Sequence, residues 1–184
     1  MMSTDGGRPA DGDRPRVVVR QALPADVRGI ERLVAIHAGE GSLVNKDLIA
    51  YFEAIQEFVV ADLADGDGSP GIVGCGALHV LWDDIAEVRT LAVDRRILRQ
   101  GVGHRILDTL LDRARNLGLR RVFSLTFEVE FFSGHGFVPI AGTPVGTDVY
   151  LQMLRSHDDG VAEFLDLARV KPNTLGNTRM MLEL

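Results

Sequence analysis

Hydrophobic positions recur at helical spacing in two segments that follow a short β-branched run. The run, residues 16–22, is rich in valine and follows a proline, which predicts a strand suited to a sheet edge. Residues 24–41 and 46–58 then place apolar side chains three and four positions apart, which predicts two helices, the first ended by glycines. The apolar faces consist of Val27, Ile30, Leu33 and Val34 in the first helix and of Leu48, Phe52 and Ile55 in the second.

Three strand-like runs come next, at residues 58–64, 71–82 and 85–93. The first two are separated by a stretch rich in aspartate and glycine and the last two by two aspartates, so we expect an antiparallel meander. The third run leads into a longer amphipathic segment that is expected to end at Gly118. Its apolar face consists of Ile106, Leu110, Ala114 and Leu117.

A further strand is expected at residues 120–127. Because strand, helix and strand follow one another here, this strand should run parallel to residues 85–93 through a right-handed crossover. A short helix within 128–137, a strand at 138–140 and a closing strand at 180–184 complete the pattern. The fold class that follows is α/β (α+β), with helices flanking a mixed, mostly antiparallel sheet that contains one parallel pair.

Composition narrows the choice of partners. The chain has 184 residues, 46% of them hydrophobic, and a net charge of −6, so one domain at residues 16–184 is expected after a disordered tail at 1–15. The acidic balance disfavours nucleic acid and anionic membranes and favours a small soluble ligand. No apolar stretch is long enough to span a membrane and no signal peptide is evident, so a cytoplasmic location is expected. The single cysteine, Cys75, lies in an apolar run without a Cys or His cluster, so neither a disulfide nor a metal site is expected.

The glycine-rich turn at the start of the long amphipathic segment is typical of a site for an anion. A helix N-terminus exposes unpaired N–H groups, and glycines let a ligand approach the backbone. A P-loop would need other spacing and a lysine, and a dinucleotide fingerprint would need a glycine where the chain has Ile106. The candidate anion-binding residues are Arg99, Gln100, Gly101, Val102, Gly103, His104 and Arg105.

This turn, with the Val93-Asp94 pair before it and the order of elements around it, resembles the coenzyme A pyrophosphate loop of the GNAT family of N-acetyltransferases. The family loop usually carries a basic or amide residue where this chain has Leu98, so Arg99 and Gln100 are the candidate substitutes. The resemblance implies acetyl-CoA as co-substrate, no metal, and a sheet whose parallel central strands splay apart. Backbone groups of Leu91, Ala92 and Val93 would then bind the pantetheine arm in the splay.

Longer blocks within residues 73–184 are similar to the short bacterial N-acetylglutamate synthases, which lack an amino-acid-kinase-like domain. Among them are "VGCGALHVLWDDIAEVRTLAVD" and "RVFSLTFEVEFFSGHGF". The resemblance implies acetyl transfer to the α-amine of L-glutamate, or of L-glutamine, by direct attack in a ternary complex, as the first step of arginine biosynthesis. Two alternatives remain open, a GNAT enzyme for another amine and a non-catalytic sensor of acetyl-CoA or an amino acid. The oligomeric state, a homodimer included, is also left open.

Only a neutral amine attacks a thioester, so a base is needed. Glu87, in the strand expected at residues 85–93 before the glycine turn, is the candidate base, and the resemblance to the long synthases also implies this role. The alternative is that Glu87 is a charged residue on a solvated strand face. Strict alternation would place Glu87, Arg89, Leu91 and Val93 on one face. Arg89 would then pair with Glu87 or bind a substrate carboxylate.

Many GNAT enzymes carry a tyrosine general acid where this chain has Phe132, which would lie beside the cofactor. Thr126 is the candidate replacement, with helix capping as its alternative role. Recognition of the substrate carboxylates is expected near the closing strand, because the long synthases bind their amino acid with basic and polar groups of this terminal hairpin. The candidates are Lys171, Asn177 and Arg179, and the alternative for Arg179 is a solvated strand end.

Overall fold

The fold is described from a computed structural model, which covers the chain except residues 1–16, 40–42, 44–45, 64–70 and 171–174. The expected tail at residues 1–15 and the candidate Lys171 lie outside the described residues.

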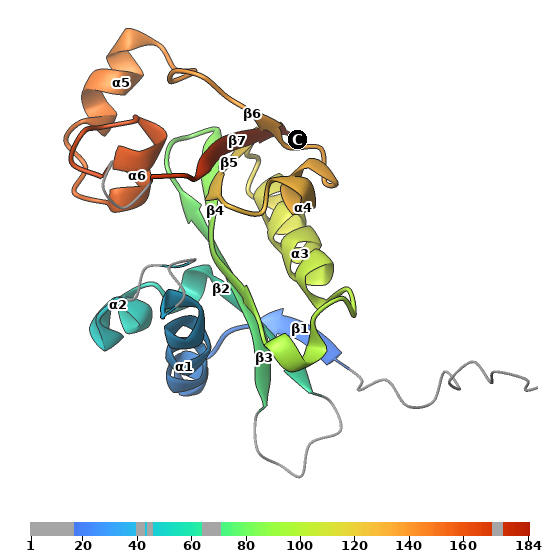
Figure 1. The fold of residues 1–184 in the computed structure, drawn as a ribbon. Helices are drawn as coiled ribbons and strands as arrows, with labels where there is room; N and C mark the ends of the chain where they lie inside the picture. Colours follow the sequence, from blue (N-terminus) through green and yellow to red (C-terminus); the bar gives the residue numbers. More distant parts are fainter. Residues whose placement is uncertain (1–16, 40–42, 44–45, 64–70, 171–174) are drawn as a thin grey trace, which may run out of the picture.

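Seven strands of the described chain form one mixed sheet in the order β1-β2-β3-β4-β5-β7-β6 (Figure 1). The strands are β1 (Val17–Gln21), β2 (Phe58–Leu63), β3 (Ile72–Val80), β4 (Ile85–Val93), β5 (Arg121–Thr126), β6 (Val138–Pro139) and β7 (Thr178–Glu183). Only β4 and β5 pair in parallel; the other pairs are antiparallel. The predicted edge strand, the meander and the parallel crossover are therefore confirmed, as is the fold class.

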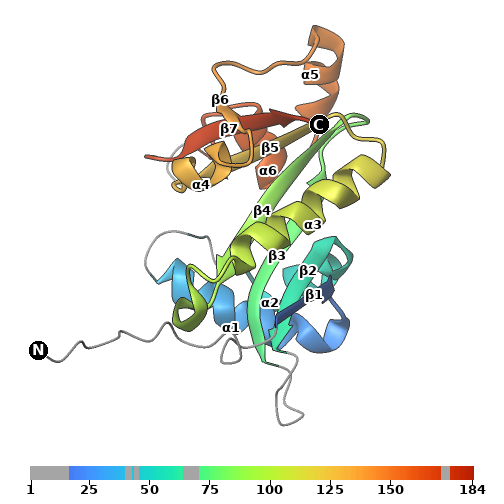
Figure 2. The same ribbon diagram turned by 90° about the vertical axis from the view of Figure 1, so that its right-hand side faces the viewer.

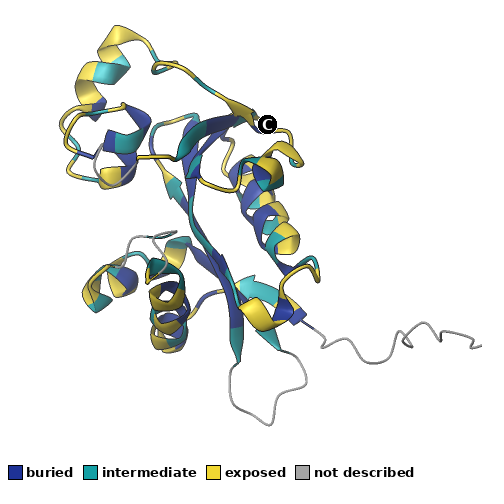
Figure 3. Cartoon of the chain, viewed as in Figure 1, coloured by how far each residue is buried: buried dark blue, intermediate teal, exposed yellow. Residues whose placement is uncertain are grey.

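Helices cover both faces of this sheet. They are α1 (Val27–Ala38), α2 (Leu48–Glu53), α3 (Val102–Asn116), α4 (Val129–Ser133), α5 (Thr147–Met153) and α6 (Asp159–Phe164), with short 3₁₀ turns at η1 (Pro24–Asp26), η2 (Ile55–Glu57) and η3 (Arg95–Ile97). The helices α3 and α4 lie on one face, and α1, α2, α5 and α6 lie on the other (Figures 1 and 2). The helices α1 and α3 turn their buried sides to the sheet and their exposed sides outward (Figure 3).

Two helical faces differ from the expected pattern at their ends. In α3, Ile106, Leu110 and Ala114 are fully buried as predicted, but Leu117 is 56% exposed because the helix ends before it and Gly118 turns the chain with φ 77°. In α2, Phe52 is 40% exposed and Tyr51 is buried in its place. The helix has only six residues and a 3₁₀ turn follows, so the spacing from Leu48 to Ile55 does not continue as one α-helical face. The predictions for Leu117 and Phe52 were wrong.

The alternation expected along β4 is also broken. Thr90 has φ 58°, and the pairing with β3 shifts between Cys75 and Ala77. This bulge turns Leu91 and Val93 toward α3, while Glu87 and Arg89 lie on the opposite face. The prediction that these four side chains share one face was wrong, because one inserted residue reverses every later side chain.

Candidate active site

A cavity of about 500 Å³ opens where β4 and β5 separate. Backbone pairing between them is confined to Ile85–Glu87 on β4 and Arg121–Phe123 on β5. Beyond that point the edge of β4 that faces β5 has no strand partner among the described residues, so its backbone groups other than the Val88 carbonyl, which accepts from Ser124, lack a ladder partner. The cavity is lined by His37, Leu43, residues 88–93, Ile97, Leu98, Arg99, residues 101–104, residues 124–128, Phe131 and Phe132.

The glycine turn forms one end of this cavity. Gly101 has φ 77° and precedes α3, whose first intrahelical bond runs from the Arg105 N–H to the Gly101 carbonyl. The N–H groups of Val102, Gly103 and His104 come before that bond, so helix geometry leaves them without an intrahelical acceptor. They and the positive end of the helix dipole suit a diphosphate. The site therefore fits the anionic part of coenzyme A.

Most of the predicted cofactor residues lie at this cavity, but Gln100 and Arg105 do not line it. The Arg105 guanidinium instead donates to the Val17 carbonyl of β1, 2.8 Å away. His104 does line the cavity, where its ring stacks on His135 with centroids 4.9 Å apart.

Sequence reasoning missed several residues that line this cavity, among them His37 and Phe131. His37 of α1 interacts with the Val93 carbonyl at 3.1 Å through Nε2, and Phe131 packs against the His104 ring. A lone histidine in a helix and one of two adjacent phenylalanines carry no motif that would have singled them out.

Hydroxyl groups support the splayed end of β5. Ser124 donates to the Val88 carbonyl at 3.2 Å, so it continues the link between β4 and β5 just beyond their last backbone pair. Thr126 is buried at the cavity and accepts a hydrogen bond from the Glu128 N–H at 2.9 Å. Its hydroxyl retains a proton to donate, so capping and proton donation are compatible. Phe132 lies at the same cavity within the main core.

Glu87 occupies the last position of β4 that pairs with β5. Its side chain points to the face opposite α3 and is only 3% exposed, and Oε2 has no hydrogen-bond partner. Burial raises the pKa of Glu87 from its ordinary value of 4.5 to about 8, while the charge of Arg89 acts in the opposite direction. A carboxylate with such a pKa is matched to accept a proton from an ammonium group near neutral pH.

Arg89 lies in a network of carboxylates beside Glu87. Its Nη1 is 3.0 Å from Asp158 Oδ2 and 3.8 Å from Glu87 Oε2, and its Nη2 is 3.0 Å from Glu57 Oε2. His79 joins the network through Glu57, with Nδ1 2.7 Å from Oε1. The predicted approach of Arg89 to Glu87 is thus present, but two other carboxylates already occupy its guanidinium. The Arg89 guanidinium therefore links β4 both to Asp158 at the start of α6 and to Glu57 of η2.

Arg179 of β7 lies over the ring of Phe123, with Cζ 5.9 Å from the centroid, and donates from Nη2 to the Phe164 carbonyl at the end of α6. Its Nε is buried without a hydrogen-bond partner. Burial lowers the pKa of Arg179 from its ordinary value. Asn177 precedes β7 and is half-buried. Arg179 thus lies on the same sheet face as Glu87, with β5 between their strands, and its Nε still lacks an acceptor.

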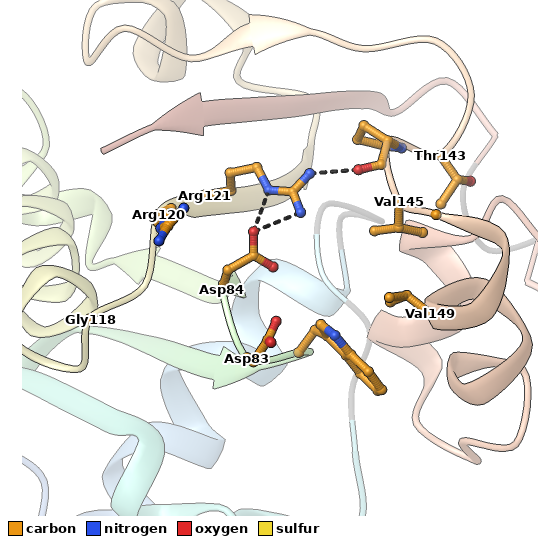
Figure 4. A pocket seen from close by; sticks show the side chains of 11 residues that line it. Asp83, Asp84, Gly118, Arg120, Arg121, Thr143, Val145 and Val149 are labelled. Atoms are coloured by element: carbon orange, nitrogen blue, oxygen red, sulfur yellow. Dashed lines mark hydrogen bonds and ion pairs between the residues drawn. The ribbon is translucent and has the colours of Figure 1, made fainter.

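A second cavity, of about 650 Å³, lies at the other end of β4 (Figure 4). The Asp84–Arg121 ion pair spans it, and Arg121 also donates to the Pro144 carbonyl. In this cavity the Asp84 carboxylate and the Arg121 guanidinium bind each other. The cavity lies at the opposite end of β4 from the glycine turn, so it belongs to a different part of the surface.

Two further findings concern the described residues alone. Nowhere in that part of the chain do three His, Cys, Asp or Glu side chains converge as a metal site would require. None of its helices combines the length and apolarity needed to cross a bilayer.

Comparison with known proteins places the chain in a family. The model of the Acetyltransferase (GNAT) family matches residues 34–137. The chain therefore belongs to the GNAT acetyltransferases, as the glycine turn and the splayed strands indicated, and acetyl-CoA is its co-substrate.

Individual relatives and a solved structure show which members of the family this chain resembles. The chain is 55% identical to an amino-acid acetyltransferase of Mycobacterium tuberculosis, over 94% of this chain and 99% of the relative. The crystal structure of Rv2747 from the same organism, in complex with CoA and NLQ, superposes with a TM-score of 0.85 at 56% identity and covers 91% of this chain and 99% of that one. An amino-acid acetyltransferase of Neisseria meningitidis is 31% identical over 66% of this chain, which spans only 27% of that relative.

Proposed function

We propose that the protein transfers the acetyl group of acetyl-CoA to the α-amino group of L-glutamate, with L-glutamine as the alternative acceptor. The observation that carries the proposal is the buried carboxylate of Glu87 at the point where β4 and β5 separate, with a pKa of about 8. The likeness to the M. tuberculosis amino-acid acetyltransferase supports an amino acid as the acceptor. The proposal extends to the first step of arginine biosynthesis in the cytoplasm.

The proposed mechanism is direct attack in a ternary complex. Glu87 acts in its ionised form, a minor fraction near neutral pH at a pKa of about 8: it takes a proton from the substrate ammonium, directly or through a water, and the neutral amine attacks the thioester carbon. Unpaired N–H groups on the β5-facing edge of β4 stabilise the oxyanion that forms. When the intermediate collapses, coenzyme A leaves as a thiolate and the nitrogen loses its second proton, which the thiolate or a water takes up. A thiol of this kind has a pKa near ~8.5, so its protonation assists the departure without being indispensable.

Substrate selection is proposed to involve the face that carries Glu87. Arg179 and Asn177 are the groups that we assign to the substrate carboxylates, because Arg179 lies on this face over Phe123 and Asn177 immediately precedes β7. Arg89 is assigned a supporting role, since Asp158 and Glu57 already bind its guanidinium.

A turnover assay tests the proposal. The purified protein is mixed with acetyl-CoA and each proteinogenic amino acid in turn, and free coenzyme A is detected with a thiol reagent. Release is expected with glutamate or glutamine and not with polyamines or a peptide N-terminus. Calorimetric binding of acetyl-CoA without release by any amino acid would contradict the proposal and identify a sensor, and release with other amines alone would identify another acceptor.

A further inference from the structure

Gly160 of α6 lies directly against the carboxylate of Glu87. A Cβ atom built on Gly160 would overlap Glu87 Oε2, lie 2.9 Å from its Cδ and lie 3.0 Å from Asp158 Oδ1. Real Cβ atoms essentially never approach other heavy atoms so closely, so any side chain at position 160 must displace the carboxylate or the helix. Only a glycine leaves Glu87 in its observed place.

Glycine is a poor residue for the inside of a helix, because it loses the most conformational freedom on folding. Gly160 is nevertheless the second residue of α6 and is buried. Its φ is not in the left-handed region, so backbone geometry does not require a glycine there. A glycine is required instead because the Glu87 carboxylate occupies the space that a side chain at position 160 would need.

The helix α6 is fixed at both ends, so it cannot simply retreat. At its start, Asp158 binds Arg89 of β4 and accepts a hydrogen bond from the Val161 N–H at 3.1 Å. At its end, the Phe164 carbonyl accepts from Arg179 of β7, and the Phe164 ring packs edge-on against Phe123 with centroids 5.4 Å apart. A side chain at position 160 would therefore move the carboxylate before it moved the helix.

We propose that Gly160 is the positioning residue for the base of the acetyl transfer: its missing side chain makes the slot in which α6 holds the Glu87 carboxylate. This inference rests on the proposed function, because Glu87 is the base only if the protein acetylates an amine. Gly160 itself touches no reacting atom and acts through Glu87.

The slot also sets the surroundings in which Glu87 titrates. Arg89 faces the carboxylate from its own strand, Asp158 and Glu163 from the segment of α6, and Lys46 from the residues before α2. Glu57 and His79 adjoin the same network through Arg89 and Asp158. Because burial is the main cause of the raised pKa of Glu87, pushing the carboxylate out of the slot should lower that pKa.

The first test needs no turnover and measures the contact. The urea midpoint of unfolding is compared for Gly160→Ala in the native background and in a Glu87→Ala background. We expect Gly160→Ala to lower the midpoint clearly more when Glu87 is present than when Glu87 is truncated, because only the 3.0 Å approach to Asp158 Oδ1 then remains. Equal shifts in the two backgrounds would show that Gly160 and Glu87 do not meet, and would overturn the inference.

The second test measures positioning. Gly160→Ala is expected to reduce kcat about 10-fold or more and to move the acidic limb of the pH profile of kcat/KM to lower pH. The matched control is Gly146→Ala at the start of α5, where nothing lies within 4 Å of the added Cβ, and it should change neither quantity. In a Glu87→Asp background, whose shorter side chain vacates the slot, Gly160→Ala should cause no further loss of kcat.

The outcomes separate this inference from the proposed function. If the native protein acetylates no amino acid, the proposed function fails, whereas the stability comparison still reports on the contact. If the native protein acetylates an amino acid but Gly160→Ala leaves the acidic limb of the kcat/KM pH profile unchanged, the positioning role is overturned. This holds whatever the result of the stability comparison.

Discussion

Replacing Glu87 with glutamine should change how the stability of the protein depends on pH. Glu87 is buried and its pKa is raised to about 8, mainly because burial penalises the charged form. The unfolded chain releases the same proton near the ordinary value of 4.5. Between these values the folded state binds more protons than the unfolded state, so Glu87 makes the free energy of unfolding fall as pH rises. Glutamine is nearly isosteric and does not titrate.

The size of the effect follows from the two pKa values. Each pH unit between them removes about 1.4 kcal/mol of stability, and the whole interval corresponds to about 5 kcal/mol. The free energy of unfolding of Glu87→Gln minus that of the native protein should therefore rise by about 3 kcal/mol between about pH 5.5 and about pH 7.5, and level off above about pH 8. Other titrating groups largely cancel in this difference, because both proteins carry them.

Urea unfolding followed by circular dichroism at several pH values measures this difference. A matched comparison is Glu163→Gln on α6, because burial also raises the pKa of Glu163, to about 7, so the rise should end at lower pH. A pH-independent difference for Glu87→Gln would refute the assignment of a protonated, buried carboxyl group. The same variant should lose about 100-fold in kcat/KM at neutral pH if Glu87 is the base, and unchanged turnover would remove it from the mechanism.

Three further outcomes are expected. Gly101→Ala should lower the free energy of unfolding by ~1–2 kcal/mol and weaken CoA binding, measured by calorimetry, about 10-fold. Gly118 has the same φ of 77° but lies at the far end of α3, so Gly118→Ala should lower stability by a similar amount and leave CoA binding unchanged. Thr126→Ala should lower the free energy of unfolding by ~1 kcal/mol and reduce kcat, because the hydroxyl that accepts from the Glu128 N–H is lost. Thr126→Ser keeps the hydroxyl and should retain both; equal losses in the two variants would point to the methyl group instead. Arg179→Ala should raise the KM for the amino acid with little change in CoA affinity, and an unchanged KM would remove Arg179 from the substrate site.

The elements that were predictable from the sequence are those whose pattern is long. The helix α3 has fifteen residues and a fully buried stripe, and its glycine turn and closing Gly118 are both local signals. The meander and the parallel crossover follow from the order of elements and from chain connectivity. The predicted cofactor loop also depends on local signals, one helix N-terminus and its glycines, and most of its residues line the cavity between β4 and β5.

The bulge in β4 could not be predicted in this way. A β-branched residue such as Thr90 strongly disfavours a positive φ, so local preference argues against the conformation that it adopts. The packing between β3, β4 and the helices imposes it, with Leu91 meeting α3 and Ala92 meeting the core below α1. Tertiary contacts thus decided which face each candidate residue occupies.

The helices α5 and α6 were missed because they are short. Each has at most seven residues, too few for a helical period to stand out, and α6 begins with aspartates and a glycine, which are typical of a turn. One signal was present: Asp158 lies three residues before Val161, whose N–H its side chain caps. That cap would have placed α6, but not against Glu87, because the contact joins residues more than seventy positions apart.

The bulge also places candidate site residues of one strand, β4, on both faces of the sheet. In a regular strand Glu87, Leu91 and Val93 would project from the same face, and the base would lie among the residues that line the cofactor cavity. With the bulge at Thr90, Leu91 and Val93 pack toward α3 while Glu87 lies under α6 on the opposite face. Backbone pairing of β4 with β5 ends at Glu87, and residues 88–93 beyond it line the cavity. In the proposed mechanism, acyl donor and amine therefore approach from opposite faces of β4, so neither displaces the other when the ternary complex forms.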